Sequence, residues 1–215
     1  MNVVISGTAS GIGKAIAETF LQNGHSVFGF DLQESCIVHP HYRHFVQDIR
    51  EGPLPELENI EILINNAGTL EESEAIDVNL TGTIRFTGHF LESPALRSVL
   101  FIASASARNG AEFPLYVASK AGIVGYMKNL ALALAERRVT CNSISPGGVI
   151  TPANRHILED ERLYAAVKAE TLLGKWARAE EIADLAYFLT VTNRSITGED
   201  ILIDNGEMLK SNFIW

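Results

Sequence analysis

The stretch that decides the fold is a glycine-rich segment near the N-terminus, Ser6-Gly7-Thr8-Ala9-Ser10-Gly11-Ile12-Gly13. It follows a β-branched run over residues 2–6 and precedes residues 14–21, whose apolar positions recur at helical spacing. This order predicts a strand, a tight turn and a helix. Glycines in such a turn let the backbone approach a pyrophosphate, whose charge is met by free N–H groups and the positive end of the helix dipole. A tight turn without a ligand is the alternative at this point.

Two other motifs with glycine-rich loops do not fit the segment. A Walker loop needs a glycine five residues before Gly13, where Thr8 stands, and a hydroxyl residue for magnesium, where Ala15 stands. A nucleophile elbow needs a G-x-S-x-G frame, which Ser10 lacks. The dinucleotide interpretation is therefore preferred over both.

Strand-like and helix-like runs alternate along the rest of the chain. Further strands are expected at residues 26–31, 44–46, 60–65, 98–104, 139–145 and 200–203, and helical stretches at 76–91, 115–136 and 180–189. This alternation favours a three-layer α/β fold, a doubly wound parallel sheet with helices on both faces. Because the chain has no internal repeat, low-complexity tract or charge block, we expect a single domain over residues 1–215.

The connections on either side of the third expected strand are short. Seventeen positions separate Asp31 from Asp48, and the next connection is equally short, whereas a parallel crossover takes about a dozen residues or more in addition to its strands. Prolines interrupt both connections, Pro40 in the first and Pro53 and Pro55 in the second. We therefore predict shortened crossovers without full helices between strands 2 and 3 and strands 3 and 4, and a thinly covered sheet edge there.

The composition excludes several classes of protein. Hydrophobic residues make up 47% of the chain and charged residues 20%, which rules out a disordered or fibrous protein. The net charge of −9 would repel nucleic acid, and no apolar run approaches the roughly 20 residues of a membrane span. With no leader sequence, we expect a cytoplasmic protein with neither a nucleic-acid nor a membrane partner. Cys36 and Cys141 have no metal-type spacing and are interpreted as buried thiols.

Asp31 ends the second expected strand, where a dinucleotide fold places an acid against the adenosine ribose. A carboxylate there accepts hydrogen bonds from both ribose hydroxyls and repels a 2′-phosphate. No Lys or Arg lies between Gly7 and Gly13, or directly after Asp31, to neutralise such a phosphate. The residues favour NAD over NADP. A carboxylate that serves only a helix N-terminus is the alternative.

Tyr116 and Lys120 are four positions apart near the start of the longest helical stretch, so they share a helix face. A phenol titrates near pH ~10 and is a poor base at neutral pH unless a nearby cation favours its phenolate. We expect Lys120 to lower the pKa of Tyr116. An isolated pair of this kind is usually plain helix surface, so its significance depends on the other motifs.

Six motifs, taken in order over residues 3–206, resemble the short-chain dehydrogenase/reductase family. Besides the glycine segment and the Tyr–Lys pair they are Asn65-Asn66-Ala67-Gly68, Asn79, Ser104 and Pro146-Gly147-Gly148-Val149-Ile150-Thr151-Pro152. The C-terminal part is similar to the 3-oxoacyl-carrier-protein reductase type at residues 173–176, 180–183, 196–200 and 204–206. The resemblance implies a Rossmann fold, and at 215 residues this would be an unusually short member.

The resemblance implies four catalytic residues. Tyr116 would be the general acid in reduction and the general base in oxidation, and Lys120 would lower its pKa and bind the nicotinamide ribose. Ser104 would hydrogen-bond the substrate carbonyl oxygen, and Asn79 would hold a water of the proton relay. Ser106 is a second hydroxyl nearby, but the spacing of Ser104 to the following glycine matches the family better.

The resemblance also implies a cofactor site for NAD, with NADP less favoured and no metal. Asp48 would contact the adenine amino group, and Val149 and Thr151 the nicotinamide carboxamide. The expected cofactor-binding residues are Gly7, Ser10, Gly11, Ile12, Gly13, Asp31, Leu32, Asp48, Ile49, Asn66, Ala67, Gly68, Tyr116, Lys120, Pro146, Gly147, Val149 and Thr151.

We expect an NAD(H)-dependent oxidoreductase that interconverts a secondary alcohol and a ketone on a small molecule. A non-catalytic NAD-binding regulator and an enoyl reductase are the alternatives, the latter typically with a wider Tyr–Lys spacing. Residues 152–176 would form the substrate lid. An acyl-carrier substrate would need basic residues at the pocket mouth, for which Arg108, Arg155 and Arg178 are candidates. A homodimer or homotetramer is expected.

Three further groups have simpler interpretations. They are His39, His41 and His44; Glu71, Glu72 and Glu74; and Asn212-Phe213-Ile214-Trp215. The histidines are expected in a solvated loop instead of a metal site, and the glutamates at a solvated helix start. The apolar tail is expected to pack in a subunit interface, with fraying and closure of a partner's substrate pocket as alternatives.

Overall fold

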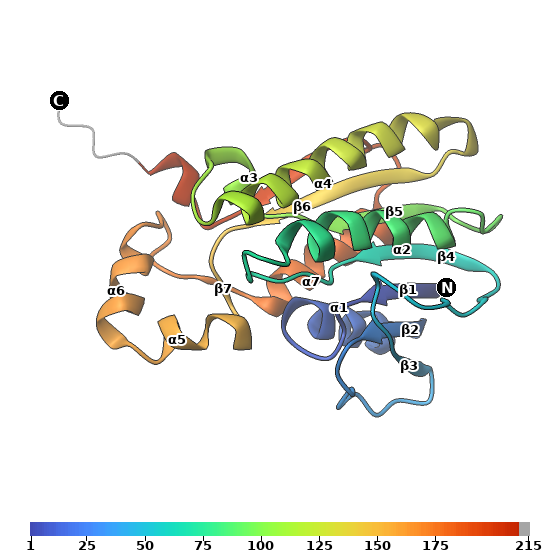
Figure 1. The fold of residues 1–215 in the computed structure, drawn as a ribbon, viewed down its shortest axis with the longest axis horizontal. Coiled ribbons are helices and arrows are strands. Elements are labelled where there is room, and N and C mark those ends of the chain that lie inside the picture. Colours follow the sequence, from blue (N-terminus) through green and yellow to red (C-terminus); the bar gives the residue numbers. More distant parts are fainter. Residues whose placement is uncertain (211–215) are drawn as a thin grey trace.

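The computed structural model describes residues 1–210, and its central layer is one sheet of seven parallel strands (Figure 1). In spatial order these are β3 (Tyr42–Val46), β2 (Ser26–Asp31), β1 (Asn2–Ser6), β4 (Ile60–Asn65), β5 (Ser98–Ile102), β6 (Thr140–Pro146) and β9 (Asp200–Ile203). The chain winds outward from β1 to β3 and then returns to place β4 on the other side of β1. Ligands of such sheets bind beyond the carboxyl ends of the strands at this switch point.

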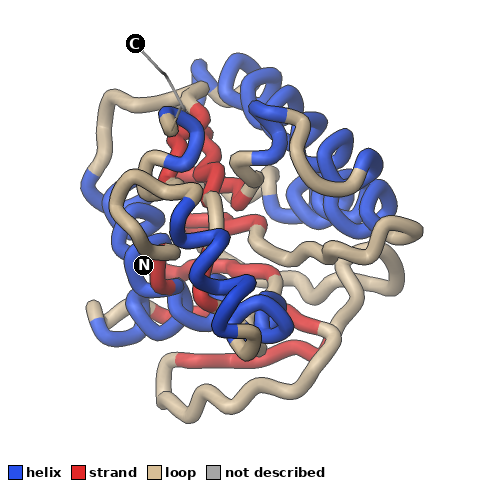
Figure 2. The backbone as a smooth tube through the Cα atoms, turned by 90° about the vertical axis from the view of Figure 1, so that its left-hand side faces the viewer, coloured by secondary structure: helices blue, strands red, loops and turns tan. Residues whose placement is uncertain are grey.

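Helices cover both faces of the sheet (Figure 2). On one face α1 (Gly11–Gln22) and α7 (Ala179–Tyr187) pack against alternate strand residues such as Val3 and Ile64. On the other face α2 (Thr83–Phe90) and α4 (Pro114–Ala133) cover the intervening positions, including Val4 and Phe101. Both faces are apolar, as expected for parallel strands that are buried on both sides. The three-layer, doubly wound α/β fold predicted from the sequence is confirmed.

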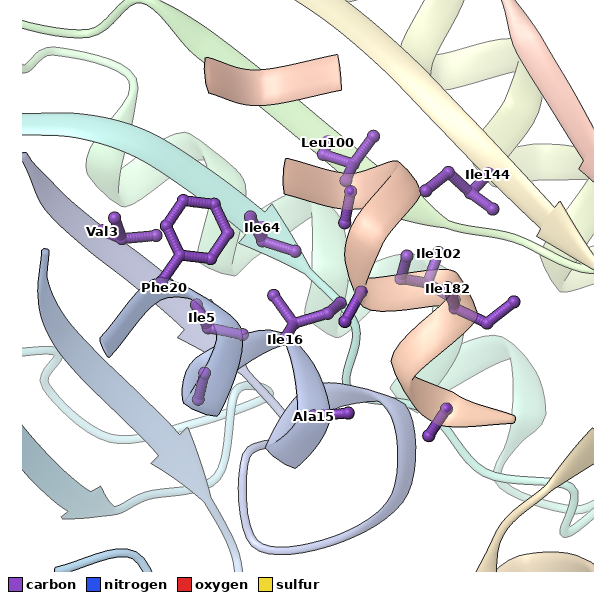
Figure 3. Close-up of a cluster of buried hydrophobic side chains, with 14 of the residues drawn as sticks. Val3, Ile5, Ala15, Ile16, Phe20, Ile64, Leu100, Ile102, Ile144 and Ile182 are labelled. Carbon is purple, nitrogen blue, oxygen red and sulfur yellow. The ribbon is translucent and has the colours of Figure 1, made fainter. Parts of the chain in front are cut away.

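The apolar face of α1 holds this helix against the sheet. Ile16 and Phe20 lie one turn apart and are completely buried between β1, β4 and α7 (Figure 3). Gly24, with a φ of +76°, follows the helix end and lets the chain turn back into β2. The packing of α1 against α7 fixes the start of α1, and with it the glycine segment.

Replacing Phe20 with Ala should lower the free energy of unfolding by about 3 to 5 kcal/mol, because the removed ring leaves a cavity in this layer. Val38→Ala is the control, since Val38 is 97% exposed and its truncation should change stability by less than about 0.5 kcal/mol. Denaturant unfolding measures both. Equal, small losses in the two variants would contradict the packing described.

The edge of the sheet at β3 is thinly covered, as predicted. Residues 32–41, between β2 and β3, and residues 47–59, between β3 and β4, contain no helix. Apolar side chains cover part of this edge in place of a helix. The Phe45 ring stacks on Phe30, which is completely buried, with the ring centres 4.8 Å apart, and Leu54 belongs to the same buried cluster. Val46 nevertheless remains half-exposed on the edge strand.

The other expected elements differ from the structure mainly at their ends. The stretch 76–91 begins as a π-helical segment, Ile76–Gly82, before α2, and α7 continues into another, Phe188–Thr192. Short elements that the periodicity does not reveal are α3 (Ser106–Asn109), α5 (Arg155–Leu158), α6 (Glu161–Ala169), and the strand pair β7 (Val149–Ile150) and β8 (Ala177–Arg178). They are too short to produce a clear apolar repeat.

The two cysteines have different environments. Cys141 is buried in β6, and burial raises the pKa of its thiol to about 12. Cys36 is exposed, so the expectation of a buried thiol is wrong there; it lies in the helix-free connection, where no core covers it. The tail residues 212–215 lie outside the described part of the chain. Within residues 1–210, no helix combines the length and apolarity that crossing a membrane takes.

Candidate active site

A cavity of about 870 Å³ lies at the carboxyl ends of the central strands. Gly7 after β1, Asp31 at the end of β2, Asn66 after β4, Ala103 after β5 and Gly147 after β6 each contribute to its wall. The cavity therefore spans the switch point of the sheet. All the predicted site residues line it except Gly13 and Asn79, which lie just behind its wall.

The glycine segment is fixed against the loop after β4. Asn66 Nδ2 donates to the carbonyl oxygens of Ser6 and Gly7, at 3.1 and 3.0 Å, and Ser6 Oγ accepts from the backbone N–H groups of Asn66 and Ala67. Gly7 has a φ of +77°, and a Cβ there would lie 2.6 Å from Asn66 Nδ2. Gly13 packs beneath the loop, where a Cβ would collide with the Gly7 carbonyl oxygen.

These features fit the pyrophosphate of a dinucleotide. Gly7, Ser10, Gly11 and Ile12 of the segment line the cavity, and Gly7 and Gly11 have no side chain of their own. The first N–H groups of α1 have no carbonyl of their own helix to bond, so they can donate to phosphate oxygens.

Two carboxylates line the cavity where strands β2 and β3 end. Asp31 accepts hydrogen bonds from the backbone N–H groups of Ala9, at 2.9 Å, and Gln33, at 3.0 Å. Asp48 forms an ion pair with Arg50, whose Nη2 lies 2.8 Å from its Oδ2, and this guanidinium lowers the pKa of Asp48. Asp48 thus lines the cavity with its carboxylate already engaged.

The predicted catalytic side chains converge at the opposite end. Tyr116 and Lys120 lie on α4, with Lys120 Nζ 5.8 Å from the centre of the Tyr116 ring and donating to the Ile102 carbonyl at 3.0 Å. Asn79 lies behind Gly68: a Cβ on Gly68 would be 3.0 Å from Asn79 Oδ1 and 3.3 Å from Lys120 Nζ. The π-helical segment that carries Asn79 thus brings its amide close to the buried ammonium.

Ser104 is placed to donate a hydrogen bond into the cavity. Its Oγ accepts from both the hydroxyl of Ser106, at 2.8 Å, and the backbone N–H of Ser106, at 3.2 Å. With both acceptor positions occupied, the remaining function of the Ser104 hydroxyl is donation. Ser106 thus orients the hydroxyl that sequence spacing favours.

The pKa values of the Tyr–Lys pair correct one expectation. Burial raises the pKa of Tyr116 to about 12, with Ser104 opposing the rise and the Glu112 carboxylate adding to it. Burial also lowers the pKa of Lys120 to about 8. The prediction that Lys120 lowers the pKa of Tyr116 below its usual value is therefore wrong for the protein by itself, because desolvation of the buried phenolate is the largest effect on this pKa.

Known proteins are similar to this chain in architecture and in sequence. The family model described as enoyl-(acyl carrier protein) reductase matches residues 43–207. An uncharacterized short-chain type dehydrogenase/reductase of Sinorhizobium fredii is 30% identical over 96% of this chain, which spans 43% of that protein. A 3-oxoacyl-[acyl-carrier-protein] reductase of Salmonella typhimurium is 27% identical, covering 94% of this chain and 95% of that one. The solved structure of a 4-hydroxyisoleucine dehydrogenase mutant complexed with NADH and succinate has a TM-score of 0.84 and 25% identity, covering 99% of this chain and 100% of that chain.

The chain belongs to the short-chain dehydrogenase/reductase family. The recognition made from its motifs, including the likeness to 3-oxoacyl-carrier-protein reductases, is confirmed, and so is the oxidoreductase class. A nicotinamide cofactor follows from the same membership. The Salmonella alignment extends over 234 positions, more than the 215 residues of this chain, which agrees with its pared-down connections.

One side of this dehydrogenase's cavity is formed by the expected lid. Residues 152–154 and several side chains of α5, α6 and their flanks, including Ile157, Val167 and Trp176, line it. The three arginines considered for an acyl carrier are not part of the wall. Arg108 pairs with Asp200 at 2.8 Å, and Arg155 with Glu159 at 3.3 Å.

Sequence reasoning missed a residue that positions Tyr116. Glu72 accepts hydrogen bonds from the backbone N–H groups of Leu115, at 2.7 Å, and Tyr116, at 3.4 Å, so it caps the N-terminus of α4 from another segment. The interpretation of residues 71–74 as a merely solvated helix start is therefore wrong for Glu72, and Glu74 lies 3.5 Å from Arg50. The available signal was Phe113, which precedes the helix and offers no side-chain acceptor to cap it.

Proposed function

We propose that this short-chain dehydrogenase/reductase uses NAD(H) to interconvert a secondary alcohol and a ketone, with Tyr116 as the general acid and base. The observation that carries the proposal is a single cavity that is lined by Ser104 and Tyr116, by the glycine segment and by Asp31. Asp31 ends β2 and Ser104 follows β5, and β1 and β4 lie between these two strands in the sheet. The lid segment lines the same cavity and would enclose a substrate beside the two hydroxyls.

The cofactor would supply the hydride; the chain supplies placement and the proton. As negative charge grows on the carbonyl oxygen during reduction, Ser104 donates a hydrogen bond to it and Tyr116 transfers its phenolic proton to it. In oxidation Tyr116 accepts the alcohol proton instead. The Lys120 ammonium stabilises the phenolate left by reduction, and Asn79, close to Lys120, holds a water that returns a proton from solvent.

NAD is proposed as the cofactor in preference to NADP. Asp31 lines the adenosine end, and its backbone partners Ala9 and Gln33 hold the carboxylate in place. The neighbouring dehydrogenase structure that contains NADH supports the same choice. We also propose a cytoplasmic location, assembly as a homodimer or homotetramer, and a small-molecule substrate.

Asp31→Arg should weaken NADH binding by about ten- to a hundredfold, because charge-assisted hydrogen bonds to the ribose are lost, and should improve NADPH binding. Fluorescence titration with each reduced cofactor measures the change. Asp184→Arg, on α7 and away from the cavity wall, makes the same charge change and should leave both affinities within about twofold. An unchanged cofactor preference in Asp31→Arg would refute the NAD assignment.

Two alternatives are separated by one assay. The description of the matching family model favours an enoyl reductase, whereas the four-residue spacing of Tyr116 and Lys120 favours carbonyl reduction. Loss of NADH absorbance is followed with a panel of small ketones and a panel of enoyl thioesters. Turnover of ketones supports the proposal, turnover of enoyl thioesters alone supports the enoyl reductase, and tight NADH binding without any turnover supports a regulator.

A further inference from the structure

A chain of three hydrogen bonds crosses the thin edge of the sheet. Thr8 Oγ1 in the glycine segment lies 3.0 Å from the Tyr42 hydroxyl, which lies 2.9 Å from His44 Nδ1, and His44 Nε2 lies 2.8 Å from the backbone carbonyl oxygen of Gln33. We call Thr8, Tyr42, His44 and Gln33 the edge relay. Tyr42 and His44 share one side of β3, two positions apart, while the two ends of the relay belong to loops that precede β3 in the sequence.

The relay has a defined direction. A carbonyl oxygen only accepts, so His44 Nε2 carries the proton and donates to Gln33, which makes Nδ1 of the neutral ring an acceptor. The Tyr42 hydroxyl therefore donates to Nδ1, and the Thr8 hydroxyl donates to Tyr42. Every polar group along the relay is satisfied, with one proton for each bond.

The sheet is shaped to make room for the relay. Gly29 in β2 lies beside it, where a Cβ would collide with the Tyr42 hydroxyl and come within 2.5 Å of Thr8 Oγ1. Thr8 itself is completely buried. Because Gly29 has no side chain, the Tyr42 hydroxyl can lie beside it and contact Thr8 of the glycine segment.

Both ends of the relay lie on segments that form the adenosine half of the cavity. Thr8 stands between Gly7 and Ser10 of the wall, and Gln33 is part of the wall itself. Asp31 bonds to the backbone of both segments, through Ala9 and Gln33. The backbone N–H groups of Gly7 and Thr8 donate to the Phe30 carbonyl, which holds the glycine segment to the end of β2. Residues 32–41 form no helix, so beyond Phe30 the relay and the Asp31 carboxylate are the side-chain hydrogen bonds that join the loop after Asp31 to the glycine segment.

We propose that the edge relay is a positioning device for the cofactor: it holds the glycine segment and the turn after Asp31 at the spacing that the adenosine half of NAD needs. The proposal rests on the proposed function, because it concerns the same site. Tyr42 and His44 touch neither substrate nor nicotinamide in this account; they act through Thr8 and Gln33. The relay replaces the support that a crossover helix would give to this edge.

The test uses Tyr42→Phe and Thr8→Val, each of which removes one hydroxyl with little change in shape. Each should raise the Kd and the KM for NADH by about three- to tenfold, the cost of one hydrogen bond, and leave kcat at saturating NADH within about twofold. The double variant should weaken NADH binding no more than about twofold beyond either single variant, because both break the same bond. Tyr187→Phe is the matched control: its hydroxyl also bonds a histidine, His25, at 3.2 Å, but away from the cavity wall.

Each outcome of these titrations supports or overturns the role proposed for the edge relay. Wild-type protein that binds no NADH would overturn the proposed function and the relay's role with it. Wild-type binding with unchanged Kd in Tyr42→Phe and Thr8→Val would overturn the relay alone. A fall in kcat with unchanged KM, or failure of both variants to fold while Tyr187→Phe folds, would likewise overturn it, because the relay would then serve chemistry or folding instead of cofactor placement. Thermal unfolding of each variant accompanies the titrations.

Discussion

Tyr116→Phe should lower kcat for ketone reduction by at least about a hundredfold, and by as much as ten-thousandfold, while the Kd for NADH stays within about twofold. The variant keeps the ring and loses only the hydroxyl that supplies the proton. Because burial already raises the pKa of that phenol to about 12, the hydroxyl is firmly protonated and suited to act as an acid in reduction. Stopped-flow NADH oxidation and fluorescence titration give the two quantities.

Tyr126→Phe is the matched control for this prediction. Tyr126 lies on the same helix and is half-buried, with its ring 5.8 Å from that of Phe101 and outside the cavity wall. Its variant should retain kcat within about twofold. Turnover that survives in Tyr116→Phe would remove the proposed mechanism, whereas equal losses in both variants would point to damage to α4.

Lys120→Met should have two opposite effects: a loss of turnover of about a hundredfold or more, and a rise in the free energy of unfolding at neutral pH of about 1 to 2 kcal/mol. The Lys120 ammonium is fully buried, and its pKa falls from 10.5 to about 8. Desolvation of this charge therefore lowers the free energy of unfolding at neutral pH. Methionine fills similar space without that cost, although the Ile102 carbonyl loses its donor.

The sign of the pH dependence follows from the direction of this shift. Between about pH 8 and 10.5 the unfolded chain keeps a proton on Lys120 that the native protein releases, so wild-type stability gains from this group as the pH rises through that window. The advantage of Lys120→Met should therefore be full below pH ~8 and shrink above it. Lys128→Met, at an exposed position of the same helix, should show neither effect. Denaturant unfolding over this range checks both; a destabilised Lys120→Met at neutral pH would contradict the account.

The sequence predicts the parts of this structure that are encoded locally. The glycine segment, the β-branched runs and the prolines of the short connections each act within a few residues, which is why the parallel sheet and its thin edge follow from them. The motif residues also converge as expected, because parallel strands deliver their carboxyl ends to one edge of the sheet.

What the sequence does not predict depends on contacts between distant segments. Glu72 caps α4 across more than 40 positions, and Tyr42 reaches Thr8 only because Gly29 leaves space for it. The raised pKa of Tyr116 likewise depends on burial, which no spacing of residues reports. Cys36 is exposed because the connection between β2 and β3 forms no helix that would bury it. The sequence predicts the short connection, but only the packed structure shows which of its side chains stay exposed.

In the proposed mechanism Ser104 and Tyr116 would hold a ketone so that hydride from C4 of NADH reaches its carbonyl carbon directly. The most direct measurement supplies NADH carrying deuterium at both C4 positions of its nicotinamide to the protein together with the panel of small ketones, and analyses the products by mass spectrometry. We expect a secondary alcohol with one deuterium on its carbinol carbon, formed by the wild type and at least about a hundredfold more slowly by Tyr116→Phe. Bound NADH with no ketone reduced, or an alcohol without the label, would contradict it.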